Sequence, residues 1–120
     1  MDDKVTAEIT NENGVAVVAF KTASLSDVEG INAAAEQIKD YINKNRPNSM
    51  VFDFDGVKFF SSQVLGLLLD IRSKLKAYNG SIAISAINPR LHRVFKITNL
   101  DKIFTFFPNR ESAVKAANVK

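Results

Sequence analysis

The residues best suited to do chemistry lie close together in the middle of this 120-residue chain, at Asp53, Asp55, Ser61 and Ser62. A carboxylate can act as a nucleophile or hold a metal ion, and a serine hydroxyl can accept a phosphoryl group. The apolar run Met50–Phe54 before them is typical of a buried central strand. Both serines are good N-cap residues for the apolar-periodic segment that follows. We therefore expect the hydroxyls at the edge of a sheet where α/β proteins form sites.

The two aspartates suggest one catalytic alternative. The segment Phe52-Asp53-Phe54-Asp55-Gly56 resembles the first motif of haloacid-dehalogenase-like phosphatases, in which one carboxylate attacks phosphorus, the other is the general acid, and magnesium lies between them. Such an enzyme needs further acids for its metal, and the acids after Asp70 are few and well separated. A magnesium-dependent phosphatase using Asp53 and Asp55 is therefore the alternative. We favour aspartates that cap the strand end and accept hydrogen bonds from loop amides.

His92 is the only histidine, and a catalytic triad would need it near one of the two serines. We expect it instead on the surface of a short amphipathic helix. With His92, basic residues cluster around that helix at Arg90, Arg93, Lys96 and Lys102. No aromatic residues are interleaved on an exposed face, which favours a solvated face or a protein contact over nucleic acid.

The composition indicates an ordinary globular domain that occupies residues 1–120. Hydrophobic residues make up 46% of the chain and charged residues 24%, and the net charge of +3 is mild. The absence of cysteine excludes disulfides, thiolate metal sites and cysteine nucleophiles. The charged N-terminus leads into no apolar run, and no stretch is long enough to span a membrane, so we expect a cytoplasmic protein.

The first part of the chain predicts a hairpin and a helix. Val5–Thr10 alternates apolar and polar residues, Asn13-Gly14 is a strong hairpin signal, and Val15–Phe20 is a continuous apolar strand. A capping box at Ser26-Asp27-Val28-Glu29 opens a helix that ends at Asn45-Arg46-Pro47. The residues expected on its buried face are Ile31, Ala35, Ile38 and Ile42.

The second part predicts alternating helices and strands. A helix over Ser62–Tyr78 ends at Asn79-Gly80, and strands follow at Ser81–Ile87 and Ile103–Phe106. The apolar stripe expected on the Ser62–Tyr78 helix consists of Val64, Leu68, Ile71 and Leu75, widened by Leu65 and Leu69.

Two more helices are expected, one capped by Asn88-Pro89 and packed through Leu91, Val94, Phe95 and Ile97, the other capped by Asn109. The order predicts a single α/β domain with a mixed, mostly parallel sheet of about five strands, four helices and an N-terminal antiparallel hairpin.

Gly66 falls on the face of its helix that carries Asp70, away from the apolar stripe. A glycine inside a helix is unfavourable by roughly 1 kcal/mol relative to alanine. Its position one turn after the serines would leave room for another backbone to come close.

Over nearly its whole length the chain resembles the STAS domain family, in the stand-alone bacterial form of the anti-sigma factor antagonists. The best local evidence is the aspartate-ended strand followed by Phe59-Phe60-Ser61-Ser62-Gln63-Val64-Leu65-Gly66. Family members typically carry aspartate, serine, serine or threonine, glycine, leucine and glycine there. The segments Asn88-Pro89, Val94-Phe95 and Thr98–Phe104 also resemble the third helix and final strand of the family.

The resemblance implies a phosphorylation-controlled interaction domain rather than an enzyme. In the family, the serine after the aspartate is phosphorylated by a kinase that is itself the anti-sigma factor, and the unphosphorylated form binds that kinase. Aligning on Leu65-Gly66 places the acceptor at Ser62, with Ser61 as second choice. Ser61 replaces the usual aspartate, Gln63 the second hydroxyl residue and Val64 the first glycine.

The expected partner is an anti-sigma factor that is also a serine kinase. We expect the chain to bind this kinase as a monomer or weak dimer. We expect it to use no cofactor or metal and to contact neither nucleic acid nor a membrane directly. The residues expected at the interface are Lys58, Ser61, Ser62, Gln63, Gly66 and Asp70.

Overall fold

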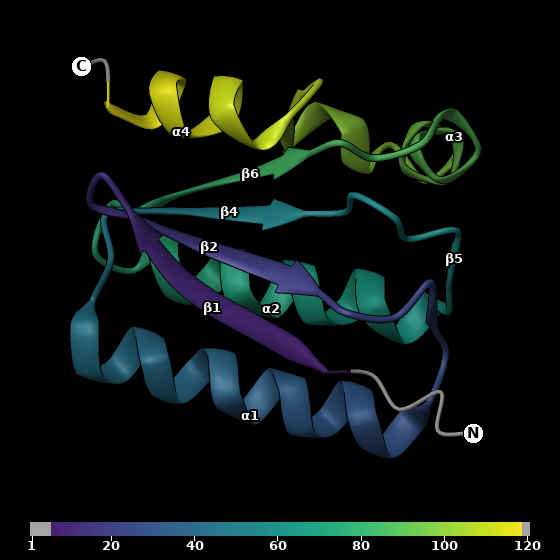
Figure 1. The fold of residues 1–120 in the computed structure, drawn as a ribbon, viewed down its shortest axis with the longest axis horizontal. Helices are drawn as coiled ribbons and strands as arrows, with labels where there is room; N and C mark the ends of the chain where they lie inside the picture. Colours follow the sequence, from purple (N-terminus) through teal and green to yellow (C-terminus); the bar gives the residue numbers. More distant parts are fainter. Residues whose placement is uncertain (1–5, 119–120) are drawn as a thin grey trace.

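A five-stranded sheet forms the centre of the molecule (Figure 1). The computed structural model describes residues 6–118 and orders the strands β1-β2-β4-β6-β7. Their bounds are Ala7–Glu12 for β1, Val15–Phe20 for β2, Ser49–Asp53 for β4, Ser81–Ser85 for β6 and Thr105–Phe107 for β7. β1 pairs antiparallel with β2, and the other neighbours pair parallel. The predicted mixed sheet with an N-terminal hairpin is confirmed.

The hairpin turn follows the sequence signal. Asn13 and Gly14 both have positive φ angles, 55° and 86°, as a tight hairpin turn requires. The strand predicted over Val5–Thr10 is β1, displaced toward its C-terminal end, and Val5 itself lies outside the described residues. β1 is an edge strand, as its half-buried pattern indicates.

Four α-helices cover the sheet within residues 6–118, in agreement with the prediction. They are α1 (Val28–Asn45), α2 (Ser62–Lys76), α3 (Pro89–Ile97) and α4 (Arg110–Asn118), with a short 3-10 helix at Leu100–Lys102. Figure 1 shows α1 and α2 on one side of the sheet and α4 on the other. No helix in this part of the chain is long and apolar enough to cross a bilayer.

Side-chain alternation along the strands separates two apolar clusters. In β2, Val18 belongs to the larger cluster with α1, α2 and α3, whereas Val17 belongs to the smaller cluster with α4. In β4, Phe52 faces the larger cluster and Val51 the smaller one. By the same period of two, Asp53 at the end of β4 points to the α4 face of the sheet.

The helix ends and faces differ from the sequence predictions in detail. Asp27, rather than Ser26, caps α1, because its side chain accepts a hydrogen bond from the amide of Gly30 at 3.1 Å. Ala34 is buried in α1 where Ala35 was expected. In α2, Leu67 is buried and Leu69 is exposed, so the apolar stripe is widened by Leu67, which lines the groove beside α1, and not by Leu69.

The later elements show two further corrections. β6 ends at Ser85, earlier than predicted, because Ala86 takes a left-handed φ of 56° that ends the extended backbone. The last strand begins at Thr105 rather than Ile103, since the 3-10 helix is followed by a turn at Ile103 and a bend at Phe104. Ile97 at the end of α3 is 73% exposed and makes no core contact of the kind predicted. The predicted caps Asn88 and Asn109 are confirmed, accepting hydrogen bonds from the amides of Leu91 and Ser112.

Sequence reasoning missed a second, two-stranded sheet. β3 (Ser24–Leu25) and β5 (Phe59–Phe60) pair parallel, so the segment before α1 lies beside the segment before α2. The amide of Ser61 also donates to the carbonyl of Leu25 at 3.0 Å. Strands of two residues carry no periodic signal in the sequence. The pairing of β3 with β5 nevertheless fixes the segment that leads into α2.

Candidate interaction site at the start of helix α2

A short loop carries the chain from the end of β4 to the start of α2. Gly56 turns it with a φ of 83°, and Lys58 is anchored by its amide, which donates to the carbonyl of Ala23 at 2.7 Å. The rings of Phe54 and Phe60 meet edge to face at 5.9 Å, so both ends of the loop are anchored in the core. The Lys58 side chain remains exposed at the surface.

Ser61 is the N-cap residue of α2 by backbone geometry, with φ −86° and ψ 166°. Its hydroxyl makes no capping hydrogen bond, and its Oγ atom is buried without a hydrogen-bond partner among the described residues. Ser61 therefore occupies the N-cap position that its residue type favours, but its hydroxyl is turned inward and bonds no helix amide. A buried, unpaired hydroxyl is unfavourable by roughly 1–3 kcal/mol.

Ser62 is the first residue of α2 and is exposed. The amides at the start of a helix lack partners within the helix and carry the positive end of its dipole. The two neighbouring serines thus have different environments: Oγ of Ser61 is buried, and Ser62 is an exposed residue at the positive end of α2.

A groove between α1 and α2 runs on from Ser62. Its volume is about 260 Å³, and its lining residues include Gly66, Gln63 and Asp70 of α2, three of the predicted interface positions. Gly66 is exposed, and a methyl group built on it would meet nothing within 4 Å. The space that the sequence predicted beside this glycine is present.

Two cross-helix contacts border the groove. Nε2 of Gln63 donates to Oδ1 of Asn32 at 2.9 Å, and Nζ of Lys39 lies 2.7 Å from Oδ2 of Asp70. The hydrogen bond with Asp70 raises the pKa of Lys39 above its ordinary value, against the smaller opposing effect of desolvation. Both bonds are exposed, so a partner could exchange them for its own polar contacts.

Asp53 is held in a buried hydrogen-bond network rather than free for chemistry. Its Oδ1 accepts from Oγ of Ser85 at 3.1 Å and from the amide of Asp55 at 3.2 Å. Its Oδ2 accepts from Nε of Arg110 at 2.9 Å, and Nη1 of Arg110 reaches Oε2 of Glu12 at 2.9 Å. Desolvation opposes the charge of Arg110, but its hydrogen bonds and charge interactions with Asp53 and Glu12 raise its pKa.

This network supports the structural interpretation of the aspartates. Asp53 accepts from a loop amide as predicted, whereas Asp55 contributes its amide and leaves its side chain exposed. Both aspartates line a hollow against the start of α4, on the face of the sheet opposite α2. No group of three His, Cys, Asp or Glu side chains within residues 6–118 is arranged to hold a metal ion. The magnesium ligands that the phosphatase alternative requires are therefore not brought together in these residues.

His92 packs against β7. Its ring packs on that of Phe106, with centroids 4.2 Å apart, and it is half-buried rather than a free surface residue. A catalytic triad with Ser61 or Ser62 is thus not assembled.

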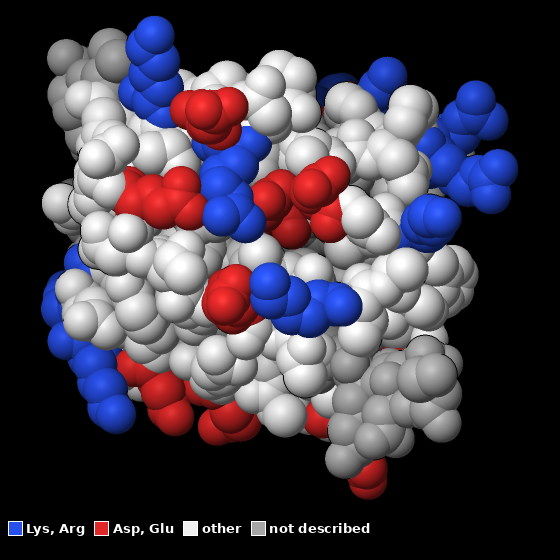
Figure 2. All heavy atoms as spheres, in the orientation of Figure 1, with Lys and Arg blue, Asp and Glu red and all other residues white. Residues whose placement is uncertain are grey.

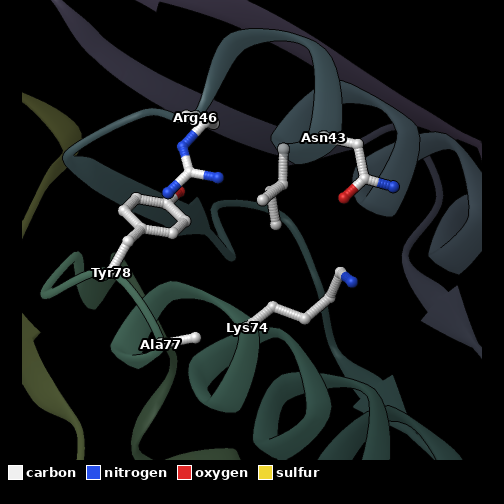
Figure 3. A pocket seen from close by; sticks show the side chains of 6 residues that line it. Asn43, Arg46, Lys74, Ala77 and Tyr78 are labelled. Atoms are coloured by element: carbon white, nitrogen blue, oxygen red, sulfur yellow. The ribbon is translucent and has the colours of Figure 1, made fainter.

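A second hollow, of about 390 Å³, lies at the opposite ends of α1 and α2 (Figure 3). Figure 3 shows the guanidinium of Arg46 over the ring of Tyr78, at 4.5 Å from its centroid, with Lys74 and Asn43 nearby. Arg46 and Lys74 lie near the C-terminal ends of their helices, where the helix dipole favours cations. The helix dipoles therefore account for the two cations at this hollow, and a bound anion is not needed to explain them.

Arg110 and Glu12 are the residues of the site region that sequence reasoning missed. Arg110 is 57 positions from Asp53 and 98 from Glu12. Local patterns cannot report a contact over such separations.

Comparison with known proteins adds evidence of a different kind. The family model described as the STAS domain matches residues 6–113. An anti-sigma F factor antagonist from Paenibacillus polymyxa is 22% identical over 112 residues, covering 93% of this chain and 94% of that protein.

Solved structures share the fold. An anti-sigma factor antagonist from Mycobacterium paratuberculosis superposes with a TM-score of 0.83 at 26% identity, covering 98% of this chain and 97% of that one. The Bacillus cell fate determinant SpoIIAA in its phosphorylated form superposes with a TM-score of 0.72 at 19% identity, covering 95% of this chain and 99% of that one.

Proposed function

The chain belongs to the STAS domain family, and on that premise we propose that it is an anti-sigma factor antagonist whose binding to a partner protein is switched by phosphorylation of Ser62. The observation that carries the proposal is the contrast between the two serines at the start of α2. Ser62 is an exposed residue, whereas Oγ of Ser61 is buried. A kinase can reach the first and not the second without unwinding the helix start.

The proposed partner is an anti-sigma factor that is also a serine kinase. The names of the similar proteins support an anti-sigma factor as the partner class. The chain itself then works in the cytoplasm as a regulator rather than an enzyme, as a monomer or weak dimer, and the kinase brings the nucleotide and metal for phosphoryl transfer.

The partner surface comprises the exposed start of α2 and the groove behind it. Lys58, Ser62 and Gly66 are exposed, Gln63 is half-buried against α1, and Asp70 pairs with Lys39 at the far end of the groove. Ser61 lies beneath this surface, and its contribution is to set the backbone direction of the helix start.

The switch follows from where the phosphate would sit. Phosphorylation adds about −1.5 to −2 charges at pH 7. The unpaired amides and positive pole of α2 accept this charge, so the domain stays folded. A partner surface matched to a neutral hydroxyl would have to bury an unpaired dianion, which is unfavourable by several kcal/mol. Asp53 takes no part, because its carboxylate lies on the α4 face, bound to Arg110.

The test is phosphorylation by the cognate kinase, followed by mass spectrometry of the modified peptide and calorimetric measurement of binding. Modification at Ser62, unweakened binding by Ser62→Ala and weakened binding by Ser62→Asp are expected. Ser61→Ala is the matched control and should remain a substrate. Phosphate only on Ser61 would show that the acceptor is misplaced by one residue. Phosphate on neither serine would overturn the switch and leave the binding function.

A further inference from the structure

Four cations gather at the corner of the molecule formed by α3 and the 3-10 helix. They are Arg90, Arg93, Lys96 and Lys102, and all four are exposed. Figure 2 shows Lys and Arg side chains collected at the corner that α3 occupies in Figure 1. We call these four cations, together with Ile97, the α3 basic surface.

None of these cations is neutralised within the described part of the chain. The ion pairs there use Lys21, Lys39 and Arg110 as their cations. The sequence of α3 contains no acidic residue, and the single acid of the 3-10 helix, Asp101, is half-buried and forms no ion pair with another residue of 6–118. Arg90 lies in the first turn of α3, where the helix dipole does not favour a cation.

The same four residues account for the positive charge of the whole protein. Taking four from its 16 Lys and Arg residues leaves 12, against 13 Asp and Glu. Without these four cations the chain would carry a net charge of −1, and their gathering on one corner makes the local potential there positive.

An exposed apolar side chain lies among the cations. Ile97 is 73% exposed, the highest value among the large hydrophobic residues of residues 6–118. It follows Arg93 by four positions, so the two side chains share a face of α3. Ile103, just after the 3-10 helix, is also exposed at 37%. An apolar anchor inside a charged rim is the usual composition of a protein interface.

A hollow of about 430 Å³ extends this corner toward the start of α2. Lys58, Asn88, Pro89 and Arg90 line it, so one further cation, Lys58, faces the same cavity as Arg90. Its shape is fixed by Asn88, whose Nδ2 donates to the carbonyl of Val57 at 3.0 Å.

We infer that the α3 basic surface docks an acidic segment of a protein partner, with an apolar side chain of that segment against Ile97 and its carboxylates against the cations. This surface lies apart from the groove between α1 and α2, shares only Lys58 with the partner surface at the start of α2, and requires neither Ser62 nor its phosphorylation. A protein segment fits better than nucleic acid, because the exposed side chain among the cations, Ile97, is aliphatic and cannot stack on a base, and the ring of His92 packs on Phe106.

The test is a titration of the ¹⁵N-labelled protein with a synthetic peptide of alternating glutamate and leucine residues. Shift changes are expected at residues 90–103 and at Lys58, with affinity that falls as salt rises. Arg93→Glu and Ile97→Ser should each weaken binding by about fivefold or more. The matched controls are Lys44→Glu and Val28→Ser, two exposed positions on α1.

Further measurements distinguish the possible ligands of the α3 basic surface and separate this proposal from the phosphorylation switch at Ser62. A glutamate–serine peptide should bind less tightly than the glutamate–leucine peptide, since it has no apolar anchor. Tighter binding to a mixed-sequence DNA duplex or to phosphatidylserine vesicles would overturn the assignment to protein, as would shifts outside the corner or no saturable peptide binding. Ser62→Asp should leave peptide binding unchanged, so failure of the phosphorylation switch would not be mistaken for failure of this surface.

Discussion

Nε of Arg110 donates a hydrogen bond to Oδ2 of Asp53 at 2.9 Å and so ties the first residue of α4 to the last residue of β4. The Asp53 side chain is 7% exposed and that of Arg110 36%. Arg110 therefore provides the only cation bound to this buried carboxylate among the ion pairs of residues 6–118.

Arg110→Met should destabilise the protein. Removing one partner of a buried ion pair typically lowers the free energy of unfolding by about 3–5 kcal/mol. Because Arg110 is partly exposed, water can replace part of the interaction, and we expect a loss of about 2 kcal/mol. Urea denaturation at neutral pH measures it. Glu12→Gln removes only the exposed half of the network and should lose less than about 1 kcal/mol; equal losses would show that Asp53 does not depend on Arg110.

The phosphatase alternative predicts that Asp53 is a nucleophile for phosphate ester hydrolysis, whereas the regulatory proposal predicts no hydrolysis. With its carboxylate bound to Arg110 and Ser85, the protein should not hydrolyse para-nitrophenyl phosphate in magnesium above the background rate. The measurement is release of the coloured phenolate, compared between the wild type and Asp53→Asn. Turnover that disappears in Asp53→Asn would contradict the regulatory proposal.

Gly66→Arg tests the groove between α1 and α2. The substitution meets no atoms within 4 Å of the new Cβ and replaces a poor helix former, so stability should be unchanged or raised. The long cationic side chain would fill the groove and weaken partner binding by at least about 2 kcal/mol. Ser73→Arg, an exposed position two turns further along α2, is the control. Equal affinity of a folded Gly66→Arg protein would place the partner elsewhere.

Ser61→Ala should not behave like the loss of a helix cap. Replacing an ordinary serine N-cap by alanine lowers stability by about 1 kcal/mol. Here Oγ makes no capping bond and is buried without a partner, so alanine should be neutral or stabilising. Thermal or urea denaturation decides. A loss as large as that of Asn88→Ala, where a capping bond is present, would show that Ser61 caps α2 in solution.

Tyr78 should titrate at high pH. Burial raises its pKa above the ordinary value, with the charge of Arg46 opposing the shift, and its hydroxyl donates to the carbonyl of Pro47 at 2.8 Å. The stabilisation that this neutral hydroxyl provides is complete below about pH 10 and is lost as pH rises through the raised pKa. Absorbance titration of a Tyr41→Phe protein isolates Tyr78. A midpoint at or below the ordinary value would contradict the burial.

The elements that the sequence predicted well are those whose signals are local. The Asn13-Gly14 turn, the caps at Asn88 and Asn109 and the continuous strand Val15–Phe20 each depend on a few adjacent residues, and the structure contains all of them. The exposure of Ser62 and the space beside Gly66 likewise follow from their positions on one helix.

The features that the sequence did not predict depend on contacts between distant segments. Which side of α2 is buried is decided by where α1 packs, so Leu67 rather than Leu69 enters the core. The pairing of β3 with β5 and the bond from Arg110 to Asp53 bring together residues far apart in the chain. A periodic pattern describes one element at a time and cannot specify such pairs.

The two-residue ladder between β3 and β5 determines how the start of α2 can open. The amides of Lys58 and Ser61 donate to the carbonyls of Ala23 and Leu25, so the strand that leads into α2 is bonded to the strand that leads into α1. Local opening of either approach must break the same few hydrogen bonds, which makes the two helix starts one cooperative unit. Hydrogen exchange at these two amides should therefore rise together, and a protease that cuts near residue 24 should also loosen the segment that presents Ser62.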